Sequence, residues 1–161
     1  MTTTLDPAIA PVITDAEAHH VYLQTRLTER TEALLATVAT RTPHEEAQRE
    51  LVDFLRAELL PHAEVEETLL YAAASTEQTA LLVRAMADEH RMLAALIDEV
   101  DQATTALDAA VAAGALVVLC DVRIEQENRI LLPALAEAGV DLTALLTEAP
   151  EIVGDTPGAK P

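Results

Sequence analysis

Four long segments of the chain place apolar residues at intervals of three and four, a spacing that predicts amphipathic helices. The predicted helices cover residues 14–40, 76–102 and 105–138, with another that starts at residue 43 and has an apolar row reaching residue 69. A short amphipathic segment follows at 141–148. Residues 1–13 and 149–161 show no sustained periodicity and are predicted to be flexible tails. Because the connections are short, the pattern predicts an all-α fold, an up-down-up-down antiparallel four-helix bundle with a short C-terminal extra helix.

Local signals indicate where the helices begin and end. Thr14 and Thr42 are predicted N-caps, and Pro43 suits a first helical position. Gly139 is predicted to end the last long helix, since glycine readily adopts the left-handed conformation found there. Pro61 lies inside the second helix, where it lacks an N–H donor and crowds the preceding turn, so we expect a bend.

Composition and charge narrow the class of protein. The chain has 161 residues, enough for one domain, and its 28 acidic and 10 basic residues give a formal charge of −18. This charge disfavours binding to nucleic acid or to anionic membranes. The N-terminus lacks a secretory signal pattern, and the longest apolar run, residues 112–120, is too short for a membrane span. We therefore expect a soluble cytoplasmic protein.

Polar residues interrupt the apolar row of every predicted long helix. The rows are His20, Leu23, Leu27, Leu34 and Val38; Leu51, Leu55, Leu59, His62, Glu66 and Leu69; Val83, Met86, His90, Leu93 and Ile97; and Leu116, Cys120, Arg123, Glu127 and Ile130. Polar side chains in such rows are costly unless they have partners. Imidazoles and carboxylates that face one another in a bundle can build a metal site. The candidate ligands are His20, His62, Glu66, His90 and Glu127.

Two of these rows contain related motifs. The segment LPHAEVEETLLYAA at 60–73 returns in altered form as DVRIEQENRILLPAL at 121–135, so that His62 and Glu66 correspond to Arg123 and Glu127. Residues four apart share a helix face, so an HxxxE pair offers an imidazole and a carboxylate to one cation. Arg123 cannot bind a metal, because its guanidinium stays charged.

The motifs, with the phrases PHAEVEETLLY, DEHRMLAAL and QENRILLP, resemble the hemerythrin-like family, also called HHE cation-binding domains. The resemblance covers roughly residues 14–138 and implies a bundle around a non-haem di-iron centre, with iron as the cofactor. It implies that Glu66 and Glu127 bridge the two ions. It also implies that His20 and His62 bind one ion and that His90 binds the other.

The chain departs from the family pattern at two positions. Met86 stands where oxygen-carrying hemerythrins place a further histidine, and Arg123 stands in place of a ligand on the last long helix. Both losses fall on the half of the site that contains His90. Arg123 either turns outward or replaces the cation by pairing with Glu66 and Glu127. Both a two-ion centre and a site with one ion or none therefore stay open.

Other polar residues have simpler interpretations. Glu58, one turn before His62, either orients that imidazole, replaces a lost ligand, or is a solvated helix residue. The remaining candidates are interpreted as surface, capping or packing residues: His19, His44, Tyr22, Tyr71 and Cys120.

The resemblance implies that the protein binds or reduces a small diatomic or peroxide ligand: dioxygen, peroxide or nitric oxide. Whether it is an enzyme, a non-haem iron oxidoreductase, stays open. The alternative is a metal-depleted or single-metal binding or regulatory module in which Arg123 replaces one metal. That alternative predicts that Arg123→Ala strongly destabilises the fold, because two buried carboxylates would lose their counter-charge. A dedicated oxidase is a third hypothesis, for which the sequence contains no substrate-binding motif.

Overall fold

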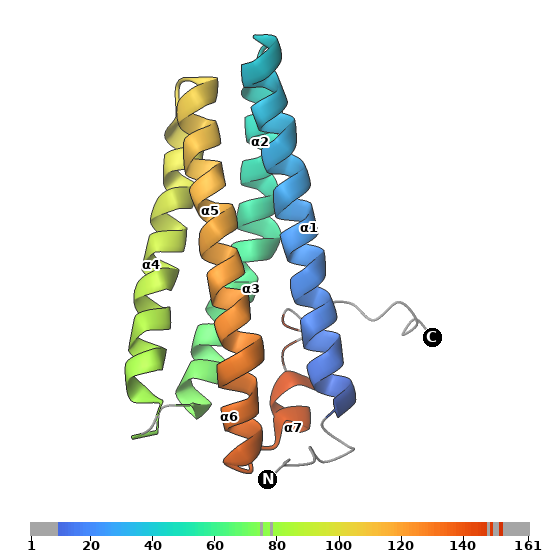
Figure 1. Ribbon diagram of the computed structural model, residues 1–161, viewed down its shortest axis with the longest axis vertical. Helices are drawn as coiled ribbons and strands as arrows, with labels where there is room; N and C mark the ends of the chain where they lie inside the picture. The colour runs from blue at the N-terminus through green and yellow to red at the C-terminus, as the bar shows by residue number, and fades with distance from the viewer. Residues whose placement is uncertain (1–9, 75, 78, 148, 150–151, 153–161) are drawn as a thin grey trace.

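The computed structural model describes residues 10–74, 76–77, 79–147, 149 and 152. Its helices form columns that stand side by side and alternate in direction (Figure 1). In chain order the columns are α1 (Ala10–Thr40); α2 (Glu45–Phe54), η1 (Leu55–Leu59), α3 (Leu60–Glu66) and η2 (Glu67–Tyr71); α4 (Ala80–Gln102); and α5 (Ala106–Gln126), η3 (Glu127–Leu131) and α6 (Leu132–Glu137). The short helix α7 (Leu142–Thr147) follows, and the elements labelled η are π-helical turns.

The columns enclose one shared interior. Helix α5 packs against α1 and α4, and α2 also packs against α1 and α4, while α7 contacts α1. The predicted four-helix bundle with a short C-terminal extra helix is therefore confirmed. Within the described part of the chain, no helix combines the length and apolar character needed to cross a bilayer.

Some helix ends differ from the prediction. Helix α1 already begins at Ala10, so Thr14 lies inside it and is not an N-cap. The second column starts after His44 at the N-cap position, so the predicted capping by Thr42 was also wrong. The third column begins at Ala80, four residues later than predicted. Gly139 ends the last column as expected, with a positive φ of 74°.

The predicted tails are also shorter than expected where the structure describes them. Residues 10–13 belong to α1, and Ala149 and Ile152 are buried against the second apolar cluster defined below. The rest of both predicted tails lies outside the described residues.

Each Leu-Pro pair in a long column directly follows a π-helical turn. Turn η1 precedes Leu60 and Pro61, and turn η3 precedes Leu132 and Pro133. Proline has no N–H and its ring crowds the carbonyl of the preceding turn, so a wider turn relieves both problems. The bend expected at Pro61 thus takes the form of a locally widened helix.

The π-helical turns also shift the buried face. Ile130 was predicted to lie inside but is 50% exposed, whereas Leu131 is fully buried. In the second column Leu69 is half-buried and Leu70 is buried. Because a π-helical turn bonds i to i+5 and holds about one extra residue, the inward row moves one position along the chain.

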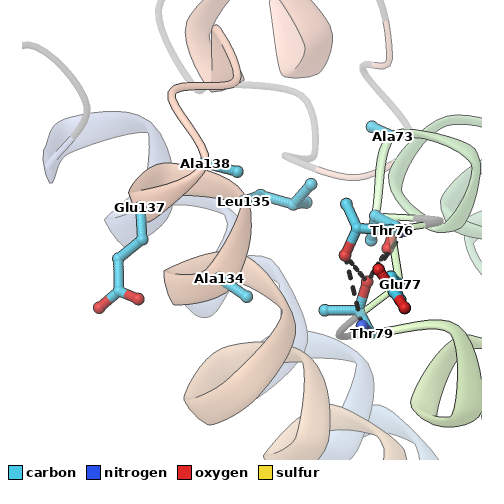
Figure 2. Close-up of a pocket in the computed structure, with 9 residues that line it drawn as sticks. Ala73, Thr76, Glu77, Thr79, Ala134, Leu135, Glu137 and Ala138 are labelled. Carbon is cyan, nitrogen blue, oxygen red and sulfur yellow. Dashed lines mark hydrogen bonds between the residues drawn. The ribbon is translucent and has the colours of Figure 1, made fainter.

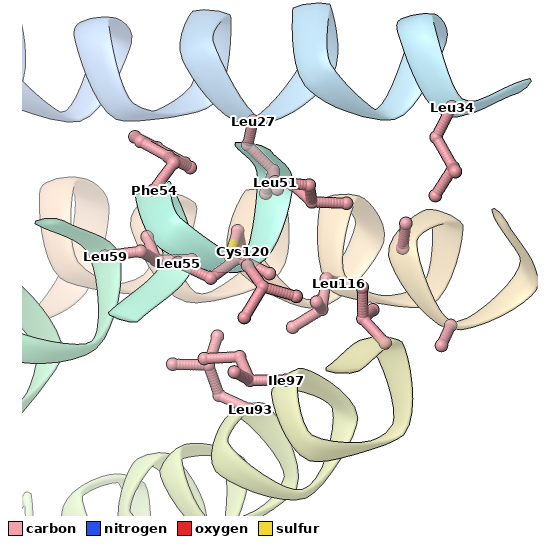
Figure 3. Close-up of a cluster of buried hydrophobic side chains, with 14 of the residues drawn as sticks. Leu27, Leu34, Leu51, Phe54, Leu55, Leu59, Leu93, Ile97, Leu116 and Cys120 are labelled. Atoms are coloured by element: carbon pink, nitrogen blue, oxygen red, sulfur yellow. The ribbon is translucent and has the colours of Figure 1, made fainter. Parts of the chain in front are cut away.

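A polar layer separates two apolar clusters in the interior. The first cluster includes Leu27, Leu55, Leu93 and Leu116 (Figure 3), and the second lies nearer α7. The side chains between them are buried, and every long column contributes at least one: His20, His62, Glu66, His90, Arg123 and Glu127. Helix α1 shows this layering within two turns. Ala16 belongs to the second apolar cluster, His20 to the polar layer and Leu23 to the first apolar cluster.

Candidate metal centre

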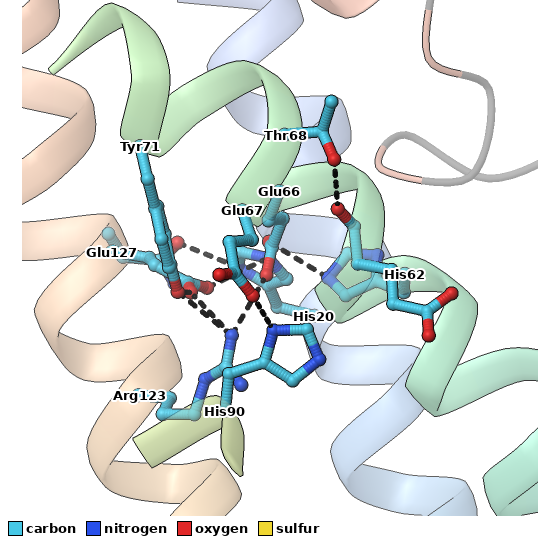
Figure 4. A network of polar contacts seen from close by, with 11 residues as sticks. His20, His62, Glu66, Glu67, Thr68, Tyr71, His90, Arg123 and Glu127 are labelled. Atoms are coloured by element: carbon cyan, nitrogen blue, oxygen red, sulfur yellow. Dashed lines mark hydrogen bonds and ion pairs between the residues drawn. The ribbon is translucent and has the colours of Figure 1, made fainter. Parts of the chain in front are cut away.

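Two imidazoles and a carboxylate converge in the polar layer. Oε1 of Glu66 lies 3.0 Å from Nε2 of His20 and 2.9 Å from Nε2 of His62. One ligand atom from each residue falls within 4.8 Å of the others, and all three residues are buried. His62 and Glu66 share a face of α3, as the i, i+4 spacing predicted, and α1 supplies His20 from across the bundle. These side chains surround one position that suits a cation (Figure 4).

A hydrogen bond that His20 donates to Asn128 in η3 orients the imidazole ring. Its Nδ1 donates to Oδ1 of Asn128 at 2.8 Å, so Nε2 faces the carboxylates. Metal-binding histidines commonly donate their second ring nitrogen in this way. Burial by itself would lower the pKa of His20, but the hydrogen bond and charge of Glu66, with help from Glu127 and Asn128, raise that pKa to about 9. In the absence of a metal, a proton on His20 therefore supplies positive charge to the site.

The two buried carboxylates have different electrostatic surroundings. Burial opposes ionisation of Glu66, but the charge of His62 and hydrogen bonds from His20 and His62 hold its pKa well below the usual range. Burial and the charge of Glu66 raise the pKa of Glu127 to about 7, although Arg123 acts in the opposite direction. Two buried carboxylates that repel each other need shared positive charge, which a proton, a guanidinium or a metal ion can supply.

Arg123 points into the bundle and binds both carboxylates. Its Nη2 lies 3.6 Å from Oε2 of Glu66 and 3.5 Å from Oε1 of Glu127. The same nitrogen donates to the hydroxyl of Tyr71 at 2.9 Å, and that hydroxyl donates to Oε1 of Glu127 at 3.0 Å. Of the two arrangements that the sequence left open, the structure shows the inward one.

His90 lies apart from the cluster of two histidines and Glu66. Its Nδ1 pairs with Oε2 of Glu67, a half-exposed residue at the start of η2 (Figure 4). Among the described residues, the group that could hold a metal ion contains His20, His62 and Glu66 without His90. Glu127 lies beside that group, with Oε2 at 3.6 Å from Nε2 of His20. A role for His90 and Glu127 as ligands stays a prediction.

The sequence pattern did not predict the roles of two residues of the site, Tyr71 and Asn128. Tyr71 was interpreted as packing, yet its hydroxyl joins Arg123 to Glu127. It follows Glu66 by five positions, a spacing that α-helical geometry directs away from the site but that the π-helical turn η2 directs inward. Asn128 gave no signal beyond its place next to Glu127, because its role depends on contact with α1.

A group of side chains extends from His62 toward the surface. His19 was expected at the surface but is half-buried, with its ring 5.1 Å from that of His62 and 5.8 Å from that of Tyr22. Burial, followed by the charges of His62 and His20, lowers the pKa of His19 to about 4. Glu58 accepts a hydrogen bond from Tyr22 at 2.8 Å and does not belong to the candidate ligand group.

A hollow of about 490 Å³ lies elsewhere, between the segment that precedes α4 and the end of the last column around α6 (Figure 2). Its lining is mostly alanine and threonine, and the hydroxyls of Thr76 and Thr79 hydrogen-bond to each other at 2.7 Å. None of the predicted ligands lines this hollow, so the candidate chemistry belongs to the polar layer.

The donor set of the polar layer fits one cation. Two imidazoles and one carboxylate on a single ion form the arrangement typical of non-haem Fe(II) sites, which keeps coordination positions open. A second ion bound by Glu66 and Glu127 would meet the fixed positive charge of Arg123, whose Nη2 already pairs with both carboxylates.

Comparison with protein families agrees with this geometry. Residues 12–135 match the family described as the hemerythrin HHE cation binding domain. A search of the curated proteins gave no match, and neither did a search of the solved structures. The matched region covers most of the chain and contains every candidate ligand. The chain therefore belongs to the hemerythrin HHE cation-binding domain family.

Proposed function

We propose that this protein binds a single non-haem iron ion through His20, His62 and Glu66. The observation that carries the proposal is the convergence of two Nε2 atoms and one carboxylate oxygen within 4.8 Å in a buried layer. A bound Fe(II) with three protein ligands keeps open coordination positions, where it can bind dioxygen, peroxide or nitric oxide. Small diatomic or peroxide molecules are therefore the proposed ligands.

The surrounding residues support such a site in distinct ways. Asn128 fixes the ring of His20 so that Nε2 faces the ion, and the HxxxE spacing in α3 does the same for His62 and Glu66. Apolar clusters on both sides exclude bulk water and strengthen the electrostatic interactions inside. Arg123 pairs with Oε2 of Glu66 and Oε1 of Glu127 and so helps to hold both carboxylates in place.

Metal content separates a one-ion site from the di-iron centre that the family resemblance implies. Protein loaded with Fe(II) without oxygen and then desalted is expected to contain one ion per chain. His62→Ala should lose that ion, because it removes one of the two imidazoles. His44→Ala is the matched control, since His44 occupies the N-cap position of α2 and makes no side-chain capping bond.

His90 provides the decisive variant. With one ion held by His20, His62 and Glu66, His90→Ala keeps one ion per chain. A di-iron centre would instead contain two ions in the wild type and lose iron in His90→Ala. If desalted wild-type protein contains no iron, the proposed function is wrong.

The inward position of Arg123 favours a second candidate function. In a metal-free binding or regulatory module, the pairs from Arg123 to Glu66 and Glu127 would stabilise the interior without any ion. Such a protein would show the same melting temperature with and without Fe(II), whereas a site with micromolar affinity raises the melting temperature when iron is present in excess.

A further inference from the structure

Helix α5 is apolar on its outer face as well as on the face that lines the interior. Between Ala106 and Cys120 it carries one charged residue, Asp108, although the chain contains 28 acidic and 10 basic residues. A helix that is apolar all round is normally buried on every side. Exposed apolar residues nevertheless follow one another at intervals of three or four positions and form the α5 stripe: Leu107, Val111, Ala115, Val118 and Val122.

Helix α1 extends this apolar surface beside the stripe. The two helices pack against each other, and Nε2 of Gln24 donates to Oδ1 of Asp121 at 2.9 Å (Figure 1). Val21 and Leu35 lie on the same face of α1 as Gln24, because they are three positions before it and eleven after it. Their side chains are 60% and 48% exposed. A stable protein–protein interface buries about 800 Å² on each partner, so apolar residues on two adjoining helices suit an interface better than one row alone.

The spacing of the α5 stripe is symmetric about its midpoint. Leu107 and Val122 lie at equal distances along the helix from that midpoint, and so do Val111 and Val118. Two α5 helices packed antiparallel about a two-fold axis there would place Leu107 opposite Val122 of the second copy. The same packing places Val111 opposite Val118 of the second copy. A two-fold interface requires such self-complementarity, because each copy contributes the same surface.

Gly114, directly before the midpoint of the stripe, is not explained by packing among the described residues. It lies inside α5, where glycine is less favourable than alanine, and a Cβ added to it would meet nothing within 4 Å. Its φ is not positive, unlike that of Gly139. The absence of a side chain lets another backbone approach closely. A second helix that crosses α5 at Gly114 would give this glycine a physical role.

We propose that the α5 stripe is a homodimer interface, in which two copies of this chain pack their α5 helices antiparallel and cross at Gly114. The stripe faces away from the polar layer, so the interface is independent of the proposed iron site. A partner recognised by opposite charge would find no charge to pair with in the stripe. The formal charge of −18 on each copy opposes association, and salt screens that repulsion. The dimer should therefore tighten as salt is added.

Sedimentation velocity of the full-length chain measures the association. We expect the mass to rise from 17.2 kDa toward twice that value as the protein concentration increases. The transition should occur at a lower protein concentration in about 0.15 M NaCl than in about 0.01 M NaCl, where the Debye length is longer. An interface held by opposite charges would show the reverse dependence on salt.

A charge in the middle of the stripe should prevent the dimer. Val118→Glu should weaken association at least a hundredfold, because the dimer would bury an unpaired carboxylate from each copy. The side chain of Val118 is 64% exposed in the single chain, so the variant should keep its helical circular dichroism. Leu81→Glu is the matched control, since Leu81 is an 80% exposed residue of α4, and it should leave association unchanged.

A double variant tests the antiparallel register. Val111→Lys combined with Val118→Glu places opposite charges across the proposed two-fold axis, so it should associate at least tenfold more tightly than either single variant. In a parallel pairing of the same helices, like charges would meet and the double variant would associate no better than the single ones.

Gly114→Ala separates the close approach of two helices from stability within one chain. In the monomeric Val118→Glu background it should raise the melting temperature by about 1–3 °C, because alanine favours the helix and its methyl group meets no neighbour. In the otherwise unchanged chain it should weaken association at least tenfold, because two methyl groups would hold the helices apart.

Three results would overturn the proposal. The first is a wild type that keeps a mass of 17.2 kDa at every protein and salt concentration. The second is a dimer that Val118→Glu leaves intact, since its interface would then lie elsewhere. The third is a dimer that Gly114→Ala does not weaken, or one that the Val111→Lys and Val118→Glu pair fails to restore.

Discussion

Replacing Arg123 by histidine should create a second metal position. The substitution removes the guanidinium that lies 3.6 Å from Oε2 of Glu66 and 3.5 Å from Oε1 of Glu127. It also creates a histidine–carboxylate pair at i, i+4 in the last column, matching His62 and Glu66 in the second. The carboxylate oxygens now paired with Arg123 would then be free to bind a cation.

The effect of Arg123 on the affinity for a second ion can be estimated from the charges in the polar layer. A divalent ion that shares these carboxylates with Arg123 would lie about 4 Å from the guanidinium, and their repulsion is about 8 kcal/mol at an effective dielectric constant of about 20. A penalty of this size lowers affinity about a millionfold. The wild type should therefore exclude a second ion at any practical iron concentration, and Arg123→His should remove the exclusion.

Metal analysis after anaerobic Fe(II) loading and desalting measures the effect. We expect one ion per chain in the wild type and two in Arg123→His. Adding His90→Ala to Arg123→His should return the count to one, because the second ion then loses an imidazole. Arg129→His is the control for a histidine added at an exposed position of the same column, and should keep one ion. Two ions in the wild type, or one ion in a folded Arg123→His variant, would refute the reasoning.

Three further predictions concern the groups around the ion. Tyr71→Phe leaves Arg123 and Glu127 without a buried hydrogen-bond partner, so it should lower the free energy of unfolding by about 1–3 kcal/mol in urea denaturation. Tyr22→Phe removes an exposed hydroxyl and should change that free energy by less than about 0.5 kcal/mol; equal effects of the two substitutions would contradict the buried network. Asn128→Ala frees the ring of His20 and should weaken metal binding about 10–100-fold in a competition titration with a chelator; unchanged affinity would show that the hydrogen bond has no orienting role. The pKa of His20 is about 9, so below pH 9 the metal ion must displace a proton from its imidazole. In that range the apparent metal affinity should rise about tenfold for each unit by which the pH rises, or roughly 30-fold from pH 6.5 to pH 8.0. A flat profile would contradict this proton competition.

Much of the fold was predictable from the periodicity of apolar residues. Positions such as Leu23, Leu55 and Leu93 are buried as the rows predicted, because α-helical spacing places them on one face. The prediction was wrong at Ile130, where the π-helical turn η3 moves the inward position to Leu131. It also put the start of α1 four residues too late, since Thr14 resembled a cap but lies within the helix.

The sequence by itself determined which residues occupy the polar layer. His20, His62 and Glu66 had to be inward, because each shares a face with apolar residues that only the interior can bury. Their chemistry followed from residue type, since an imidazole and a carboxylate one turn apart can bind one cation. The arginine of the Arg123–Glu127 pair, which corresponds to His62 of the His62–Glu66 pair, was equally visible in the sequence.

Only the tertiary structure decided how these residues divide among partners. Arg123 pairs with carboxylates on two columns, while His90 turns to Glu67 instead of joining His20 and His62. These pairings depend on the distances between helices and on the π-helical turn that brings Tyr71 inward. The spacing of residues along one helix predicts neither of them. The physical reason is that a periodic pattern fixes the face on which a side chain lies, whereas its partner depends on the neighbouring helices.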